Sequence, residues 1–315
     1  MAELTVRLAG LTLRNPFILA SGIWGESGVS LAGAWKAGAG AVVTKSIGSS
    51  PRPGYANPTI ETYDRWGMLN AMGLPNPGIA EYPKEVATAL EAGATVLGSV
   101  FGATPDEFAS LAERMAATGV AALELNLSCP HAEGYGTEVG GTPEAVGAIV
   151  RAVTRAVKVP VVAKITPNSA DPAALAVAAE RAGARAISAI NTVRGLAIDV
   201  RLRRPVLSHG VGGLSGPAIK PVGLAVVWQI AQKVSVPVIG IGGVATAEDA
   251  LEYLMAGATA VQVGTAVAFE GVGLFHRLPR ELSELLDEVG LPSAEASVGA
   301  ARAAAPVPQP PSPPR

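Results

Sequence analysis

Short, largely apolar runs recur along the chain, and most of them follow a glycine phrase. The phrase reads Ala-Gly-Ala at 37–39, 92–94, 182–184 and 256–258, with a close variant at 118–120. Glycine readily takes the left-handed conformation that ends a helix, and an apolar run without polar alternation is typical of a strand in a buried parallel sheet. Each repeat therefore predicts a helix, a stop and a buried strand.

Eight such strands can be counted, which is the number that closes a (β/α)8 TIM barrel. They are 17–20, 41–44, 95–98, 121–125, 161–163, 186–189, 238–240 and 260–263. Residues 4–14 have the pattern of an N-terminal hairpin that closes the bottom of the barrel. The connections 46–80 and 192–217 are too long for plain linkers, so they predict functional loops at the carboxyl ends of the strands, with a hairpin at 197–207.

Composition supports one large domain. Hydrophobic residues make up 49% of the 315 residues, and 37 are glycine. We expect residues 1–299 to form the barrel domain, and residues 300–315, rich in alanine and proline, to be a disordered tail. The first ten residues lack the basic and apolar pattern of a secretion signal, so we expect a cytoplasmic protein.

Charge and cysteine content narrow the possible partners. The 24 basic and 26 acidic residues are spread along the chain and leave a net charge of -2, which gives no field to hold nucleic acid or a membrane surface. The single cysteine excludes an internal disulfide and any metal or iron-sulfur site that needs several thiolates. We therefore expect no metal, no nucleic acid and no membrane.

Polar residues follow the predicted strands, at the edge where such barrels carry their active sites. They are Ser21, Lys45, Ser99, Asn126, Lys164, Asn191 with Thr192, Gly242 with Gly243, and Gly264 with Thr265. A serine or threonine there is ordinarily a strand-end cap, but a lysine after a buried strand is costly unless an anion or acceptor meets it. We interpret Lys45 and Lys164 as ligand contacts. The glycine pairs fit the phosphate site of such barrels, although they also make ordinary tight turns.

Three asparagines and the cysteine complete the candidate chemistry. Asn70, Asn126 and Asn191 each offer a donor and an acceptor, which suits a ring edge with alternating C=O and N–H groups; the alternative is that they stabilise loops. Cys129 follows Asn126 in a polar loop that contains a proline. A free cysteine is more often an inert core residue, but this loop favours a thiolate that acts as base or nucleophile.

These residues stand in an ordered set of motifs. The motifs are Asn15-Pro-Phe, Ala20-Ser-Gly, Thr44-Lys-Ser, the GMLNAMGL run at 67–74, Asn126-Leu-Ser-Cys-Pro, Lys164-Ile-Thr-Pro-Asn, Ile190-Asn-Thr, the GGLSGPAIKP run at 212–221, Gly240-Ile-Gly-Gly and Gly264-Thr. On these motifs the chain resembles the soluble class 1 dihydroorotate dehydrogenases up to about residue 290.

The resemblance implies FMN-dependent oxidation of dihydroorotate to orotate in pyrimidine biosynthesis, with Cys129 as the catalytic base. One FMN per chain would contact Ser21, Lys45, Ser46, Asn126, Lys164, Ile190, Gly216, Gly242, Gly243, Gly264 and Thr265. Dihydroorotate would be held by Lys45, Asn70, Gly73, Leu74, Asn126, Asn191 and Thr192. Ser99 and His131 differ from the residues that are usual in the family, and His131 is a second candidate for the base.

The electron acceptor divides the family. The 205–224 run and the 67–78 loop resemble the NAD-linked type, in which FAD and an iron-sulfur cluster lie on a partner subunit. We expect a homodimer or a heterotetramer with that partner. The membrane-bound, quinone-reducing class, with its serine base and N-terminal extension, does not fit. The alternatives are a fumarate-linked homodimer, a flavin enzyme acting on uracil-like pyrimidines and, from another class, a non-flavin phosphate-barrel lyase or isomerase that uses the lysines.

Overall fold

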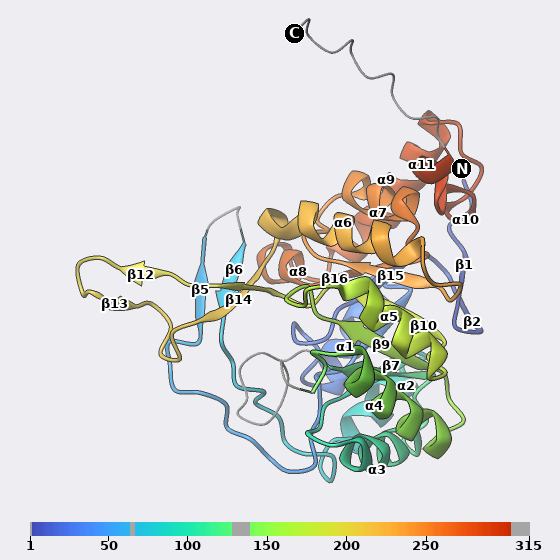
Figure 1. Cartoon of the computed structure of the whole chain (residues 1–315). Coiled ribbons are helices and arrows are strands. Elements are labelled where there is room, and N and C mark those ends of the chain that lie inside the picture. The colour runs from blue at the N-terminus through green and yellow to red at the C-terminus, as the bar shows by residue number, and fades with distance from the viewer. Residues whose placement is uncertain (1, 64–66, 128–138, 304–315) are drawn as a thin grey trace, which may run out of the picture.

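A computed structural model describes residues 2–63, 67–127 and 139–303 of the chain. Its centre is a closed barrel of eight parallel strands surrounded by helices (Figure 1). In chain order, which is also the order round the barrel, the strands are β3 (Phe17–Leu19), β4 (Ala41–Val43), β7 (Val96–Val100), β8 (Ala122–Asn126), β9 (Val161–Ile165), β10 (Ala186–Ala189), β15 (Val238–Ile241) and β16 (Ala260–Val263). All eight predicted strands are present, with ends shifted by no more than about two residues, so the predicted (β/α)8 fold is confirmed.

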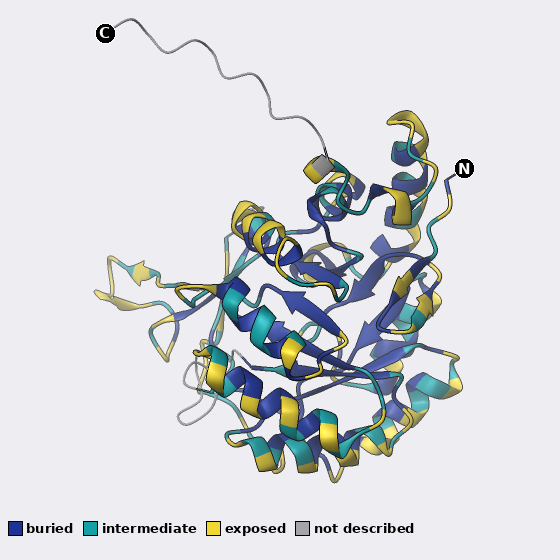
Figure 2. Cartoon of the chain, turned by 45° about the vertical axis from the view of Figure 1, so that its right-hand side comes forward, coloured by how far each residue is buried: buried dark blue, intermediate teal, exposed yellow. Residues whose placement is uncertain are grey.

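The helices cover the barrel from outside. They are α1 (Gly28–Lys36), α2 (Pro83–Glu91), α3 (Pro105–Ala116), α4 (Pro143–Ala156), α5 (Pro172–Arg181), α6 (Lys220–Ala231), α7 (Ala247–Ala256), α8 (Thr265–Glu270) and α9 (Leu274–Glu288). Figure 2 shows buried strands and helices that are exposed only on their outer faces, so the core lies between the two layers. Within the described residues, no helix is long and apolar enough to cross a membrane.

Local signals in the sequence set the ends of these helices. Thr104 and Thr142 cap α3 and α4 by accepting a hydrogen bond from the backbone three residues on, and a proline follows each of them at the first helical position. The glycines of the repeated phrase end helices as predicted: Gly38, Gly183 and Gly257 have φ values of 114°, 103° and 118°.

The N-terminal hairpin is also confirmed. Strands β1 (Val6–Leu8) and β2 (Leu11–Leu13) pair antiparallel and turn at Ala9 and Gly10. Figure 1 shows the hairpin at the end of the barrel opposite the long loops. Its apolar side chains Val6, Leu8 and Leu13 belong to the main core.

The C-terminal segment departs from the expectation at its start. Helix α10 (Ala294–Ser297) returns to the N-terminal segment, where the Ala294 N–H donates to the Glu3 carbonyl at 2.8 Å. The first residues of the expected disordered tail form a short helix, α11 (Ala300–Ala303), because the Gly299 N–H donates to the Leu254 carbonyl and so ties the chain to α7. Residues 304–315 lie outside the described residues.

The two long connections form a second sheet over the mouth of the barrel. Its antiparallel strands, in spatial order, are β11 (Val193–Gly195), β14 (Gly212–Ser215), β6 (Met68–Asn70) and β5 (Ile60–Thr62). The predicted hairpin is present as β12 (Ile198–Asp199) and β13 (Arg204–Pro205), an arm that projects from the body (Figure 1). The four-stranded sheet was not predicted. Its strands are three or four residues long, and β6 pairs with a strand that lies far away in sequence, so no local pattern reports the pairing.

Candidate functional site

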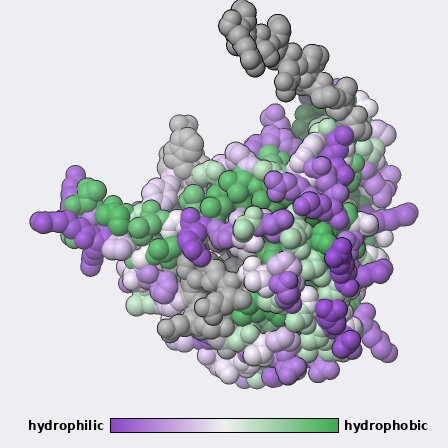
Figure 3. Space-filling model, in the orientation of Figure 1, coloured by the Kyte–Doolittle hydropathy of each residue, from purple (hydrophilic) through white to green (hydrophobic). Residues whose placement is uncertain are grey.

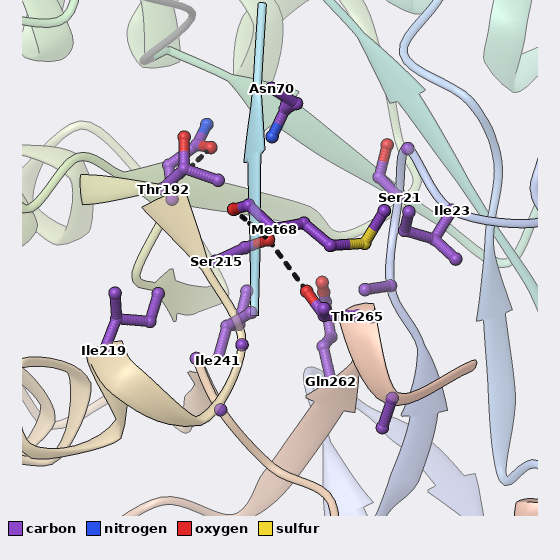
Figure 4. Close-up of a pocket in the computed structure, with 18 of the residues that line it drawn as sticks. Ser21, Ile23, Met68, Asn70, Thr192, Ser215, Ile219, Ile241, Gln262 and Thr265 are labelled. Carbon is purple, nitrogen blue, oxygen red and sulfur yellow. Dashed lines mark hydrogen bonds between the residues drawn. The ribbon is translucent and has the colours of Figure 1, made fainter. Parts of the chain in front are cut away.

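A cavity of about 580 Å³ lies between the carboxyl ends of the barrel strands and the second sheet (Figure 4). Every predicted site residue that the structure describes lines it. These residues are Ser21, Lys45, Ser46, Asn70, Gly73, Leu74, Asn126, Lys164, Ile190, Asn191, Thr192, Gly216, Gly242, Gly243, Gly264 and Thr265. Cys129 and His131 lie outside the described residues.

Both predicted lysines reach this cavity, and each has a carboxylate partner from the chain itself. Lys45, two residues after the end of β4, has its Nζ 3.0 Å from Oε1 of Glu26. Lys164, on β9, has its Nζ 3.4 Å from Oε1 of Glu124 on the neighbouring strand β8. Glu26 is 70% exposed, whereas Glu124 is fully buried. The two pairs therefore differ in how far water can replace a lost partner.

The three asparagines line the same cavity, and hydrogen bonds fix their amides. Nδ2 of Asn191 donates to Oδ1 of Asn126 at 3.3 Å, and Nδ2 of Asn126 donates to Oγ of Ser46 at 3.1 Å. Nδ2 of Asn70, on the second sheet, donates to the Gly213 carbonyl at 3.1 Å. The convergence inferred from the sequence is confirmed, and the asparagines present oriented amides rather than freely rotating ones.

Three serine hydroxyls lie next to these amides. Oγ of Ser46 lies 3.2 Å from Oγ of Ser21 and 2.8 Å from Oγ of Ser99. Ser99 was expected at a strand end, but β7 continues to Val100, and Ser99 is fully buried behind Ser46. It orients Ser46 and does not line the cavity.

The glycine turn after β15 exposes backbone to the cavity. Gly242 and Gly243 have φ values of 124° and 73°, and Gly216 approaches from the second sheet with a φ of 98°. A Cβ at Gly243 would lie 2.8 Å from Cβ of Lys220 and 2.9 Å from the Gly216 carbonyl oxygen. Only glycine fits there, because a side chain would fill the space between the turn and the second sheet.

An ion pair supports this turn from behind. Nζ of Lys220 lies 2.6 Å from Oδ1 of Asp249. Burial acts to raise the pKa of Asp249, but hydrogen bonds from Lys220 and from the N–H groups of Ala245 and Thr246 outweigh it, so the pKa lies below its ordinary value. The support is therefore intact at neutral pH and is lost only as the pH falls through the lowered pKa of Asp249.

The turn after β16 is joined to the second sheet. Oγ1 of Thr265 lies 2.8 Å from Oγ of Ser215, which donates to the Met68 carbonyl at 3.4 Å (Figure 4). Ser215 and Met68 line the cavity and were not predicted. Each stands at the end of a short strand, Met68 in β6 and Ser215 in β14, whose pairing the sequence did not reveal.

The sequence reasoning also missed a polar cluster inside the barrel. Oε2 of Glu124 accepts a hydrogen bond from Nε2 of Gln262 at 2.6 Å and from Oγ of Ser188 at 3.0 Å. Within the described part of the chain, Oε1 of Gln262 is a buried side-chain oxygen without a partner. A signal was present in the sequence, since Glu124 and Gln262 interrupt apolar strands, whereas the predicted site residues all follow the predicted strands.

Comparison with known proteins shows which family this chain resembles. The family described as dihydroorotate dehydrogenase matches residues 3–286. A protein of Thermococcus kodakarensis is 49% identical over 301 residues, which cover 96% of this chain and 99% of that protein. A protein of Methanocaldococcus jannaschii is 47% identical over 293 residues, which cover 91% of this chain and 95% of that protein. Both are named dihydroorotate dehydrogenase B (NAD(+)), catalytic subunit.

Proposed function

Because this chain belongs to the dihydroorotate dehydrogenase family, we propose that it oxidises dihydroorotate to orotate with FMN bound in the cavity at the mouth of its barrel. One observation carries the proposal: the residues expected to contact FMN or dihydroorotate come from seven barrel strand ends and from the second sheet, and all those described line a single cavity. The 47–49% identity over nearly the whole chain to catalytic subunits of this enzyme supports it.

The residues of the cavity fit FMN. About 580 Å³ is within the range of roughly 300–1,000 Å³ that is usual for ligand sites. Gly216, Gly242 and Gly243 line the cavity with backbone in positive-φ conformations that favour glycine, and such a backbone cradle suits a phosphate. Lys164 offers a cation that suits the pyrimidine ring of a flavin, where negative charge collects on reduction. When bound, FMN accepts the hydride that carbon six of dihydroorotate loses.

The chain's own residues would hold the substrate and take its proton. Lys45 would bind the substrate carboxylate, and the oriented amides of Asn126 and Asn191 would bind the ring edge, with Asn70, Gly73, Leu74 and Thr192 completing the site. Cys129 would remove the proton from carbon five while carbon six loses its hydride. Holding the substrate rigidly aligns both bonds with their acceptors, which is where much of the rate enhancement arises.

The functional test is anaerobic bleaching of the FMN-loaded protein. Dihydroorotate is expected to bleach the flavin, whereas dihydrouracil, which lacks the carboxylate, is not. Bleaching by dihydrouracil instead would favour the uracil-type enzyme. A purified protein that binds no flavin, even when FMN is supplied, would overturn the oxidoreductase proposal in favour of the lyase or isomerase class.

Gly243→Ala tests the phosphate cradle. We expect FMN to bind about 10- to 100-fold more weakly, because alanine is strained at a φ of 73° and its Cβ would displace Lys220 or Gly216. Fluorescence titration with FMN measures the change. Gly33→Ala in α1, where an added Cβ meets nothing within 4 Å, is the matched control. Unchanged affinity in Gly243→Ala would exclude this turn as the phosphate site.

Glu26→Gln tests the role of Lys45. The carboxylate of Glu26 pairs with the Lys45 ammonium at 3.0 Å, and the substrate carboxylate would need the same ammonium. Removing its charge is expected to lower KM for dihydroorotate by up to about fivefold, the size of an exposed ion pair, with little change in kcat. Glu81→Gln, which breaks the exposed Glu81–Lys84 pair, is the control. A raised KM would instead mean that Glu26 positions Lys45 for the substrate.

We propose that the electrons pass to NAD through a second subunit that carries FAD and an iron-sulfur cluster. Two observations support this: the relatives are named NAD(+)-linked catalytic subunits, and this chain's single cysteine cannot hold such a cluster. Adding NAD, with and without a copurified partner, to the dihydroorotate-reduced protein tests it. Reoxidation by fumarate alone would favour the fumarate-linked homodimer.

We also propose that the catalytic chain forms a homodimer. The arm of β12 and β13 carries exposed Leu196, Ile198, Val200 and Leu202. Figure 3 shows hydrophobic residues beside hydrophilic ones along this projecting arm. So short a hairpin gains little stability by itself, and an exposed apolar stripe of this kind suits a second copy of the chain. A monomer in sedimentation experiments on the isolated chain would contradict the proposal.

A further inference from the structure

A charged cluster occupies a place where barrels of this kind usually pack apolar side chains. It consists of Glu124, Lys164, Ser188 and Gln262, and we call it the Glu124 cluster. The four residues belong to β8, β9, β10 and β16, and their side chains meet inside the barrel, where layers of branched apolar residues are the rule. An ionised group in such a place calls for a reason beyond packing.

Glu124 is held from three directions. Its Oε2 accepts hydrogen bonds from Ser188 at 3.0 Å and from Gln262 at 2.6 Å, while its Oε1 faces Nζ of Lys164 at 3.4 Å. Strands β8 and β16 lie four places apart in the closed ring of eight, so Gln262 reaches Glu124 from the opposite side of the barrel. The two neutral donors fix the carboxylate in position, and the fixed carboxylate in turn fixes the ammonium.

Only part of the cluster touches the cavity. Lys164 and Gln262 line it, whereas Glu124 and Ser188 are fully buried and do not. A ligand in the cavity can therefore contact Lys164 but not Glu124, whose charge acts on the ligand only from a distance. With water excluded from the pair, the negative charge of Glu124 offsets part of the field that the lysine projects into the cavity.

Resting on the proposed function, we propose that Glu124 is a positioning residue that holds the Lys164 ammonium at the bound flavin and limits the positive charge the flavin meets. The lysine favours the negative charge of the reduced flavin, and the carboxylate moderates that preference. The reduced flavin thereby remains a strong enough reductant to pass its electrons on. The role concerns the tuning of the cofactor and not the capture of the substrate.

Glu124→Gln separates charge from shape, because the amide has the size of the carboxylate without its charge. Sulfite adds to flavins to give a negatively charged adduct, so its affinity reports the local positive charge without any turnover. On FMN-loaded protein we expect Glu124→Gln to bind sulfite about tenfold more tightly and to shift the flavin midpoint potential in the positive direction. Absorbance titrations measure both.

Ser188→Ala is the matched control, since it removes a neutral donor to the same carboxylate and leaves both charges. It is expected to keep sulfite affinity within about twofold of wild type. Glu124→Asp serves if Glu124→Gln does not fold: it keeps the charge, draws it back from Lys164, and is expected to give an intermediate increase in sulfite affinity.

The outcomes distinguish the two proposals. Unchanged sulfite affinity and potential in Glu124→Gln, or in Glu124→Asp where the first variant does not fold, overturn the role of Glu124 even if dihydroorotate still bleaches the wild type. A wild-type chain that holds no FMN overturns the proposed function, and the role of Glu124 with it.

Discussion

Replacing Cys129 by alanine is expected to slow the reduction of bound FMN by dihydroorotate about 10²- to 10⁴-fold, the usual contribution of a positioned general base. The position of this residue in the sequence motivates the test: β8 ends at Asn126 in the cavity wall, and Cys129 comes three residues later along the chain, outside the described residues. Anaerobic stopped-flow absorbance of the flavin measures the rate.

The affinity for FMN separates loss of the base from loss of the site. Cys129→Ala is expected to bind FMN as the wild type does, since the proposed cofactor contacts lie on other residues. His131→Ala is the comparison variant, because His131 is the other candidate base in the same segment. Undiminished reduction in Cys129→Ala, together with a large loss in His131→Ala, would move the base to His131.

Lys164→Met is expected to destabilise the protein by about 3–5 kcal/mol, the cost of leaving one partner of a buried ion pair uncompensated. Glu124 is fully buried, and after the change only the neutral donors Ser188 and Gln262 would meet its carboxylate. A loss of this size is a large part of the stability of an ordinary domain. Urea unfolding of the FMN-free protein measures it without interference from the ligand.

Lys45→Met provides the matched control, because its partner Glu26 is 70% exposed and water can take the place of the lysine. We expect the loss of this ion pair in Lys45→Met to lower the free energy of unfolding by no more than about 1 kcal/mol. The double variant Lys164→Met with Glu124→Gln is expected to recover much of the stability lost in Lys164→Met, since no buried charge remains. Equal stability of Lys164→Met and the wild type would show that the buried pair contributes nothing.

The barrel was predictable because its strands are buried on both faces. Each strand appears in the sequence as a short, largely apolar run, most of them preceded by the glycine phrase, and the number of runs predicts the architecture. The position of the site followed from one further rule, that the residues after parallel strands share an edge. This rule predicts from the sequence that Lys45, Asn126 and the Gly242 turn lie together.

The second sheet and the Glu124 cluster could not be predicted, because they depend on strand pairings that no local sequence pattern reports. Strand β6 pairs with β14, although more than a hundred residues separate them, and this pairing places Met68 and Ser215 over the cavity. Glu124 and Gln262 lie within apolar strands, and which side of a strand faces the inside of the barrel depends on the register around the closed ring. Tertiary structure, rather than composition, makes Glu124 the partner of both Lys164 and Gln262.

The most direct test of the proposed function is the stoichiometry of a single anaerobic turnover. FMN-loaded protein, mixed with excess dihydroorotate and no electron acceptor, is expected to lose the absorbance of oxidised flavin and to release one orotate for each FMN reduced. Flavin that stays oxidised, or flavin that is reduced without formation of orotate, would contradict the conclusion that this cavity oxidises dihydroorotate.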